Sequence, residues 1–290
     1  MGFDSPLLEY GMSKSYGSRR WYDFGEMETN SQTLIKIQFM KKRKEVLIVT
    51  GAARGIGAAT VEIAAEKGYS VCINYRSNIA AAENLAQSIN DRGGEAIAVE
   101  ADVSDEDDVV RLFDTVDKHL GPVTALVNNA AILPASMPVN AMSFDRLSRV
   151  FNTNVIGPMI CSREAIKRMS TATGGQGGAI VNISSIVAKY GSPNEVNDYA
   201  VSKAAIDMLT IGLAREVAAE GIRVNAVRPS LVYTDMVVAS GNGDRFERVK
   251  QIHPMKRAGY TEEVANAIIW LLSEEASYTA GAIIDVNGGR

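Results

Sequence analysis

Residues 46–57 read VLIVTGAARGIG, and this stretch decides the fold. It begins with an apolar run that predicts a buried β-strand, and a helical pattern follows the stretch. Between strand and helix stand Gly51, Gly55 and Gly57, which let the backbone turn tightly and approach a ligand closely. The N-terminus of a helix that follows such a loop offers N–H groups to a pyrophosphate. The stretch therefore predicts a nucleotide-binding unit of strand, loop and helix.

A second informative stretch is 179–205, AIVNISSIVAKYGSPNEVNDYAVSKAA. It opens with a short apolar strand that ends at Ser184 and Ser185, where open α/β sheets place their ligands. Tyr199 and Lys203 follow in a helix-forming segment and project from one helical face. A phenol titrates near pH ~10, and a neighbouring cation favours the phenolate. The pair alone also fits an ordinary helix surface, but in this setting it predicts a tyrosine that exchanges a proton near neutral pH.

From Glu45 onward, strands alternate with helices, which indicates a parallel sheet with right-handed crossovers. Strands are expected at 46–50, 70–75, 96–101, 123–128, 179–183, 222–227 and 282–286. Helices are expected at 55–67, 78–92, 105–119, 143–170, 198–219 and 261–273. The glycine-rich segment 174–178 leads into a strand instead of opening a helix, so it is expected to be a loop. The predicted fold class is α/β, a single Rossmann-type, doubly wound domain whose seven-stranded parallel sheet carries helices on both faces.

The glycine spacing is T-G-x-x-x-G-x-G, and Asn128-Asn129-Ala130, Asn154, Ser185, Tyr199 and Lys203 follow it in this order. This set resembles the short-chain dehydrogenase/reductase family over about residues 41–290. The resemblance implies a nicotinamide cofactor and a catalytic tetrad of Asn154, Ser185, Tyr199 and Lys203. In that tetrad Tyr199 is the general acid and base, and Ser185 hydrogen-bonds the substrate oxygen. Lys203 lowers the pKa of Tyr199 and binds the nicotinamide ribose, and Asn154 completes a proton relay through a water.

The end of the second strand bears on the choice of cofactor. An NAD-binding fold usually places Asp or Glu there to hold the ribose hydroxyls. This chain has the neutral Asn74 instead, followed by Tyr75, Arg76 and Ser77. Arg76, together with Arg54 of the glycine loop, would supply cations for a 2′-phosphate, although both arginines could instead simply face solvent. The pattern favours NADP(H).

The family resemblance extends the cofactor site along the chain. The further expected contacts, in addition to Tyr199 and Lys203 themselves, are Ile56, Asp102, Val103, Asn129, Ala130, Ala131, Pro229, Val232 and Thr234. Two positions depart from the family pattern, because Ala131 and Ser230 stand where the family usually has glycine. The methyl group of Ala131 would narrow the space beside the cofactor. Glycine often adopts backbone angles that other residues avoid, so the sequence does not predict the backbone conformation at Ser230.

The composition limits the classes of function. The chain has 290 residues, 46% hydrophobic and 22% charged, which is ordinary for a soluble globular protein with one large α/β core. Its net charge of −4 argues against general nucleic-acid binding. The two cysteines, Cys72 and Cys161, have no metal or redox spacing, so no metal site is expected. No run approaches the ~18 apolar residues of a membrane span. A reducing, cytoplasmic location fits these features.

Two segments have little pattern. Residues 1–39 lack helical or strand periodicity and have no apolar leader, so they are expected to be a disordered or dispensable extension of a catalytic domain at 40–290. A functional arm is the alternative. Residues 236–258 form a long connection of the kind that is commonly a lid over the substrate. His253 lies within this connection and is expected at the surface.

The expected function is an NADP(H)-dependent oxidoreductase that interconverts a carbonyl and an alcohol by hydride transfer. Two other substrates fit the same pattern, a 3-oxoacyl thioester and a sugar oxidised at its anomeric carbon, as in a glucose-type 1-dehydrogenase. A different class is a catalytically silent nucleotide-binding regulatory protein, but such a protein need not keep Tyr199 and Lys203 together. The expected helices 143–170 and 198–219 carry apolar residues on more faces than one sheet contact uses. By family resemblance they pair across a two-fold axis, which predicts a homodimer or homotetramer.

Overall fold

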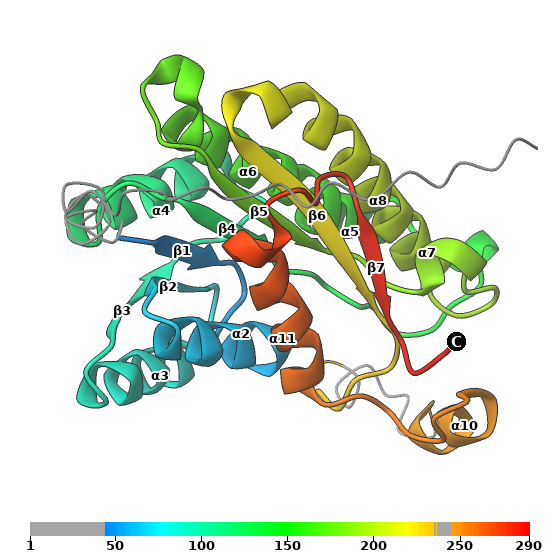
Figure 1. The fold of residues 1–290 in the computed structure, drawn as a ribbon. Coiled ribbons are helices and arrows are strands. Elements are labelled where there is room, and N and C mark those ends of the chain that lie inside the picture. Colours follow the sequence, from blue (N-terminus) through cyan, green and yellow to red (C-terminus); the bar gives the residue numbers. More distant parts are fainter. Residues whose placement is uncertain (1–43, 235, 237–244) are drawn as a thin grey trace, which may run out of the picture. The chain divides into compact units, whose positions relative to one another are not determined.

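The computed structural model describes residues 44–290 except 235 and 237–244, so the expected extension at 1–39 lies outside the described residues. Seven parallel strands form one sheet in the order β3-β2-β1-β4-β5-β6-β7 (Figure 1). The strands are β1 Val46–Val49, β2 Ser70–Tyr75, β3 Glu95–Glu100, β4 Ala125–Asn128, β5 Gly178–Ile183, β6 Ile222–Pro229 and β7 Ile283–Val286. The predicted doubly wound sheet is confirmed, and every strand ends within two residues of its expected bounds. The chain reverses its order between β1 and β4, which is where folds of this kind bind ligands.

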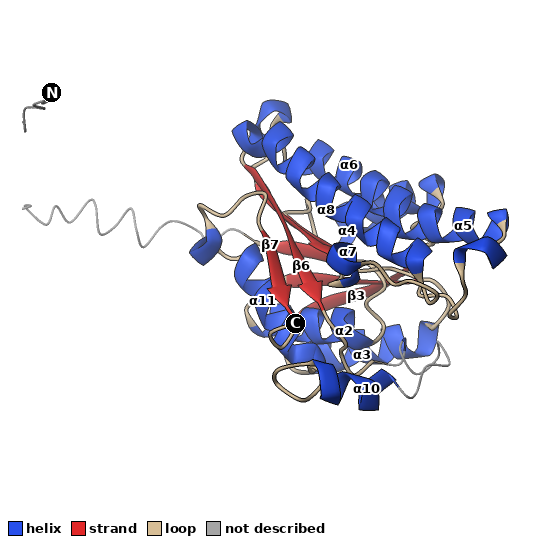
Figure 2. Cartoon of the chain, turned by 90° about the vertical axis from the view of Figure 1, so that its right-hand side faces the viewer, coloured by secondary structure: helices blue, strands red, loops and turns tan. Residues whose placement is uncertain are grey.

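Helices cover both faces of the sheet (Figure 2). One layer holds α2 Gly55–Glu66, α3 Ile79–Asp91 and α11 Thr261–Leu272. The opposite layer holds α4 Glu106–His119, α5 Phe144–Phe151, α6 Gly157–Met169 and α8 Asn197–Val217. Among the helices of the described residues, none is long and apolar enough to cross a bilayer.

The core explains why β1 is apolar at every position. Leu47 and Val49 pack with the layer of α2, α3 and α11, whereas Val46 and Ile48 pack with the opposite layer. All four side chains are at most 1% exposed. A strand buried on both faces cannot alternate apolar with polar residues, and this is the usual situation in a parallel sheet.

The helix expected at 143–170 runs without interruption from residue 144 to residue 169, but one of its turns is not α-helical. The structure has α5, then a π-helical turn at Asn152–Ile156, and then α6. Pro158 in the first turn of α6 has no N–H to donate to the carbonyl of Asn154, and its ring would collide with that carbonyl in a regular α-helix. The backbone instead forms the wider turn, in which the Gly157 N–H bonds to the Asn152 carbonyl. Turns of this kind occur frequently at functional sites.

Two short helices were also not predicted. They are α7 Val187–Tyr190, which follows β5, and α10 Arg245–Ile252. The second lies in the connection at 236–258 that was expected to be a lid, and part of that connection lies outside the described residues.

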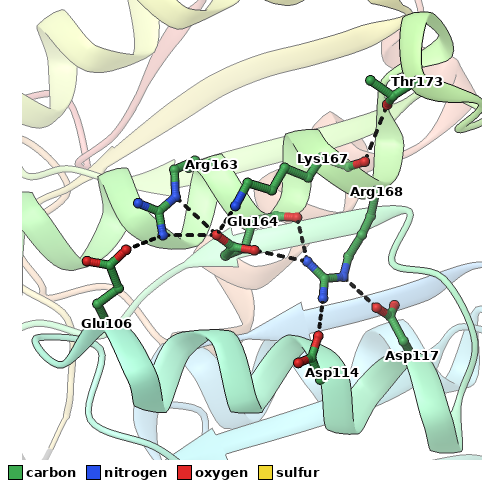
Figure 3. A network of polar contacts seen from close by, with 8 residues as sticks. All are labelled: Glu106, Asp114, Asp117, Arg163, Glu164, Lys167, Arg168 and Thr173. Carbon is green, nitrogen blue, oxygen red and sulfur yellow. Dashed lines mark hydrogen bonds and ion pairs between the residues drawn. The ribbon is translucent and has the colours of Figure 1, made fainter.

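A network of charged side chains joins α4 to α6 (Figure 3). At its centre, the carboxylate of Glu164 accepts hydrogen bonds from Arg163, Lys167 and Arg168. The two arginines continue to carboxylates of α4, namely Glu106, Asp114 and Asp117. Because the side chain of Glu164 is only 5% exposed, this network is less screened than ordinary surface ion pairs.

We expect Glu164→Gln to lower the free energy of unfolding at pH 7 by about 1–3 kcal/mol, because three cations lose their shared charge. Burial raises the pKa of Glu164, but the hydrogen bonds from Lys167 and Arg163 outweigh it, so the net pKa lies below its ordinary value. The stabilisation is therefore present above the pKa of the unfolded state and is lost as pH falls through the lower, folded pKa. Urea unfolding at pH 7 and pH 4 should show a smaller difference from wild type at pH 4. The exposed Glu83→Gln serves as control, and an equal loss at both pH values would contradict the expectation.

Candidate active site

The first of two adjoining cavities lies at the carboxyl ends of β1 to β4 and has a volume of about 440 Å³. Nearly all residues expected to hold a cofactor on this side of the molecule line it. They are Gly51, Arg54, Gly55, Ile56, Asn74, Tyr75, Arg76, Ser77, Asp102, Val103, Asn129, Ala130, Ala131 and Thr234. Lining residues that were not predicted include Ile132 and Thr153. Both adjoin family motifs, but neither carries a chemical signal of its own.

Close packing explains two of the loop glycines. Gly51 has φ +62°, and a Cβ there would lie 2.9 Å from the Cα of Ala130. A Cβ at Gly57 would lie 2.6 Å from Nδ2 of Asn129. That nitrogen donates to the carbonyls of Thr50 and Gly51, at 2.8 and 3.0 Å. Gly57 therefore lets α2 approach the loop and does not itself line the cavity, unlike the other predicted glycines.

The N-terminus of α2 is open towards a ligand. Arg54 precedes the helix and makes no capping hydrogen bond with its side chain, and the first turn contains no acidic residue. The N–H groups and the positive end of the helix dipole are therefore available to an anion. The side chains of Arg54 and Arg76 are exposed and line the same cavity. These residues fit the phosphates of a dinucleotide.

Asn74 has a different role from the one expected. It is 1% exposed, and its Oδ1 accepts from the N–H of Gly51 at 3.1 Å. Its Nδ2 donates to the carbonyls of Ala101 and Val99, at 3.0 and 3.3 Å. An aspartate here would set a carboxylate against two carbonyl oxygens, so the loop and sheet require the amide whatever the cofactor. Its neutrality is therefore no sign of NADP(H), and the cofactor preference must be argued from Arg54 and Arg76.

The second cavity has a volume of about 590 Å³ and shares a wall with the first. The shared wall is formed by Ile56, Asn129, Ala131, Thr234 and Met236. Of the residues predicted from the sequence, the second cavity also contains Ser185, Tyr199, Lys203, Pro229 and Val232. Sequence reasoning missed several polar lining residues, including Glu195, Gln251 and Arg290.

Lys203 is buried beside the expected proton donor. Its side chain reaches the carbonyl of Ile183, to which Nζ donates at 2.7 Å, and Nζ lies 5.6 Å from the ring centre of Tyr199. Burial lowers the pKa of Lys203 to about 8, while the carboxylate of Asp207 opposes this shift. The ammonium form therefore still predominates at pH 7. A cation at this place favours the phenolate form of Tyr199.

Asn154 lines neither of the two cavities. It is fully buried, and its amide pairs with the backbone of Ile132, donating at 3.1 Å and accepting at 2.9 Å. Nδ2 also donates to Oγ of Ser202 at 3.1 Å. The structure thus brings Ser185, Tyr199 and Lys203 into one cavity, whereas the side chain of Asn154 fixes the chain that follows β4. Its role in a proton relay stays a prediction.

His253 is not at the surface, contrary to expectation. It is 1% exposed, and its Nε2 lies 2.6 Å from Oγ of Ser230, which lines the second cavity. The only non-glycine residues with positive φ in the described ranges are Asn194 and Lys256. Ser230 therefore has an ordinary backbone conformation, and this position does not need the glycine of the family pattern.

Within the same described ranges, no group of three or more His, Cys, Asp or Glu side chains could hold a metal ion.

Comparisons with known proteins agree with this geometry. A family model described as enoyl-(acyl carrier protein) reductase matches residues 51–290. The uncharacterized oxidoreductase YgfF of Escherichia coli is 51% identical over 245 residues, which cover 84% of this chain and 99% of that protein. Glucose 1-dehydrogenase 2 of Bacillus subtilis is 38% identical, and the match covers 83% of this chain and 93% of that protein.

A solved structure of similar fold supports the same assignment. It is a double mutant of a Serratia marcescens short-chain dehydrogenase/reductase, with a TM-score of 0.78 and 32% identity. The match covers 84% of this chain and 97% of that one. The chain therefore belongs to the short-chain dehydrogenase/reductase family of oxidoreductases.

Proposed function

We propose that the protein is an NADP(H)-dependent oxidoreductase that interconverts a carbonyl and an alcohol. The observation that carries this proposal is that Ser185, Tyr199 and Lys203 line a cavity that shares a wall with the cavity at the glycine loop. The bound nicotinamide would supply or accept the hydride. The shared wall would then place the substrate carbon beside the cofactor and the substrate oxygen beside the polar side chains.

The chain's own residues handle the proton and the oxygen. In reduction, Tyr199 gives its proton to the developing alkoxide, and Ser185 donates a hydrogen bond to the same oxygen. Lys203 supplies the cation that favours the phenolate, and it binds the nicotinamide ribose. Asn154 belongs to the relay that returns a proton to Tyr199. Acid catalysis of this kind contributes roughly 10²–10⁴-fold, and a hydrogen bond to the oxyanion contributes about 10²–10³-fold.

Two narrower substrate classes stay open within this proposal. The name of the Bacillus subtilis relative favours oxidation of a sugar at its anomeric carbon. The name of a Staphylococcus aureus relative that is 36% identical, a 3-oxoacyl-[acyl-carrier-protein] reductase, favours reduction of a 3-oxoacyl thioester. Fold likeness cannot choose between them, because function depends on the site.

The test is oxidation of NADPH and NADH by the purified full chain with a panel of ketones, aldehydes and 3-oxoacyl thioesters. Reduction of NADP and NAD with sugars and simple alcohols completes the panel. Turnover of any carbonyl or alcohol supports the proposal. If no member is turned over although NADPH binds, the alternative of a silent nucleotide-binding regulatory protein is favoured.

Tyr199→Phe should lower kcat by two or more orders of magnitude and leave NADPH affinity within about two-fold, because only the proton donor is lost. The measurements are steady-state kinetics and fluorescence titration of NADPH. Near wild-type turnover in this variant would show that another group supplies the proton.

For the cofactor, we expect kcat/KM to favour NADPH over NADH by at least about 10-fold, since one charge-assisted phosphate contact of ~1.5–3 kcal/mol suffices. Arg76→Ala should remove most of this preference while hardly changing the value for NADH, which has no 2′-phosphate. Asp102 lies 3.7 Å from the Arg76 guanidinium in an exposed contact, so the phosphate would compete with it for this cation. Arg92→Ala, at an exposed arginine that directly follows α3, is the control. A wild type that prefers NADH, or equal losses with both cofactors, would refute the proposal.

We propose that the chain forms a homodimer or homotetramer through α5, α6 and α8. Large apolar side chains are exposed along these helices, among them Phe144 at 81%, Met159 at 50% and Met208 at 67%. Association of two chains through these helices would remove such side chains from water. Light scattering at micromolar concentration should give at least twice the chain mass of 31.2 kDa. A monomeric mass would exclude this assembly.

We also propose a cytoplasmic location. Both cysteines, Cys72 and Cys161, are free and buried, as befits a chain that needs no oxidising compartment. Cell fractionation that recovered the protein outside the cytoplasm would contradict this.

A further inference from the structure

A buried ion pair lies next to the expected proton donor and has no part in the mechanism above. Arg146 of α5 donates from Nε to Oδ2 of Asp198 at 2.7 Å, and from Nη2 to Oδ1 at 3.2 Å. The side chain of Arg146 is 9% exposed, and that of Asp198 is 0% exposed. Two parallel charge-assisted bonds of this kind fix geometry as well as contributing energy.

Asp198 holds the beginning of the catalytic helix. It occupies the first turn of α8, directly before Tyr199, and its Oδ1 also accepts from the backbone N–H of Tyr199 at 2.9 Å. Val196, which precedes this helix, provides no capping side chain. The carboxylate of Asp198 therefore takes over a backbone donor that the helix leaves unpaired, and that donor belongs to Tyr199 itself.

Arg146 also bonds to the segment after β4, which contributes to the wall of the second cavity. Its Nη1 donates to the carbonyl of Ala135 at 2.8 Å, in the segment that follows β4. The same segment contributes Leu133 to the cavity. It is also tied to the catalytic side, because the N–H of Met137 donates to the carbonyl of Glu195, another lining residue, at 2.6 Å. One guanidinium thus joins α5, the cavity wall and the start of α8.

We propose that Arg146 and Asp198 are positioning residues that set the place of Tyr199 relative to the cavity-lining segment that follows β4. This inference rests on the function proposed above. Neither residue lines either cavity, so neither needs to touch the substrate. The pair acts through the backbone of Tyr199, and a shift of that backbone displaces the phenol from the substrate oxygen. Displacements of about 1 Å can cost a large factor in rate, because proton transfer requires hydrogen-bond contact.

Two features of the pair predict how substitutions should differ. A lysine at position 146 keeps the charge but lacks the planar fork that bonds both oxygens of Asp198. A glutamine there leaves the Asp198 carboxylate buried without its cation, which is a costly arrangement. The double variant Arg146→Gln with Asp198→Asn removes both charges and keeps two side chains that can hydrogen-bond each other. The double variant should therefore have a higher kcat than Arg146→Gln alone.

The experiment compares these variants with Glu164→Gln, which removes another buried charge from its ion pairs but lies away from both cavities. We expect Arg146→Lys to lower kcat about 10-fold and Arg146→Gln about 100-fold, with KM and NADPH affinity changed less than about three-fold. The double variant should recover at least several-fold over Arg146→Gln. Glu164→Gln should lower the thermal midpoint while keeping kcat. All rates are measured at least 15 °C below each midpoint, and Arg146→Lys remains informative if Arg146→Gln does not fold.

A second readout does not depend on turnover. In protein labelled with ¹³C at Cζ of tyrosine, the Tyr199 signal is assigned by its loss in Tyr199→Phe. This signal should shift in Arg146→Lys and stay in place in Glu164→Gln. Normal kcat in the folded Arg146 variants, or losses that follow stability as in Glu164→Gln, would overturn the positioning role. If wild type turns over no substrate, the proposed function fails, and an unmoved Tyr199 signal would then separately overturn this inference.

Discussion

The site depends on a reciprocal set of hydrogen bonds between Thr50 and Asn129, at the point where the strand order reverses. Oγ1 of Thr50 accepts from the N–H groups of Asn129 and Ala130, both at 3.0 Å. The amide of Asn129 returns bonds to the carbonyls of Thr50 and Gly51. These contacts lock the end of β1 to the end of β4. The glycine loop starts from this junction, and the wall shared by the two cavities is built on it.

The sequence predicted the parts that depend on local pattern. The apolar run of β1, the glycine loop and the spacing of Tyr199 and Lys203 are each readable within a few residues, and the structure brings them to one edge of the sheet. Strand positions were predictable for the same reason, since strands buried on both faces are continuous apolar runs bounded by polar residues. The resemblance to the family rested on the order in which these motifs occur along the chain, and it connected them into one site.

The parts that failed depend on partners distant in sequence or on a backbone rearrangement. The neutral side chain of Asn74 was interpreted as a sign of NADP(H), but its amide bonds to the glycine loop and to Val99 of β3, and these partners cannot be known before the strands are paired. His253 was expected at the surface, but it is enclosed partly by the C-terminal segment. A Cβ atom added at Gly288 would lie only 3.6 Å from the His253 ring. The π-helical turn is an exception, because Pro158 within an apolar helical pattern was a visible sign of a break.

The shared wall has a consequence for how this enzyme can diversify. Ile56, Asn129, Ala131 and Thr234 line both cavities, so any change of side-chain size at these positions alters the room in both together. Arg54 and Arg76 line the first cavity alone, and Gln251 and Arg290 line the second alone. Substitutions at Arg54 or Arg76 can therefore alter the first cavity without altering the second, and substitutions at Gln251 or Arg290 can do the reverse. The shared positions have no such independence, so a change that suits one cavity must also be tolerated by the other.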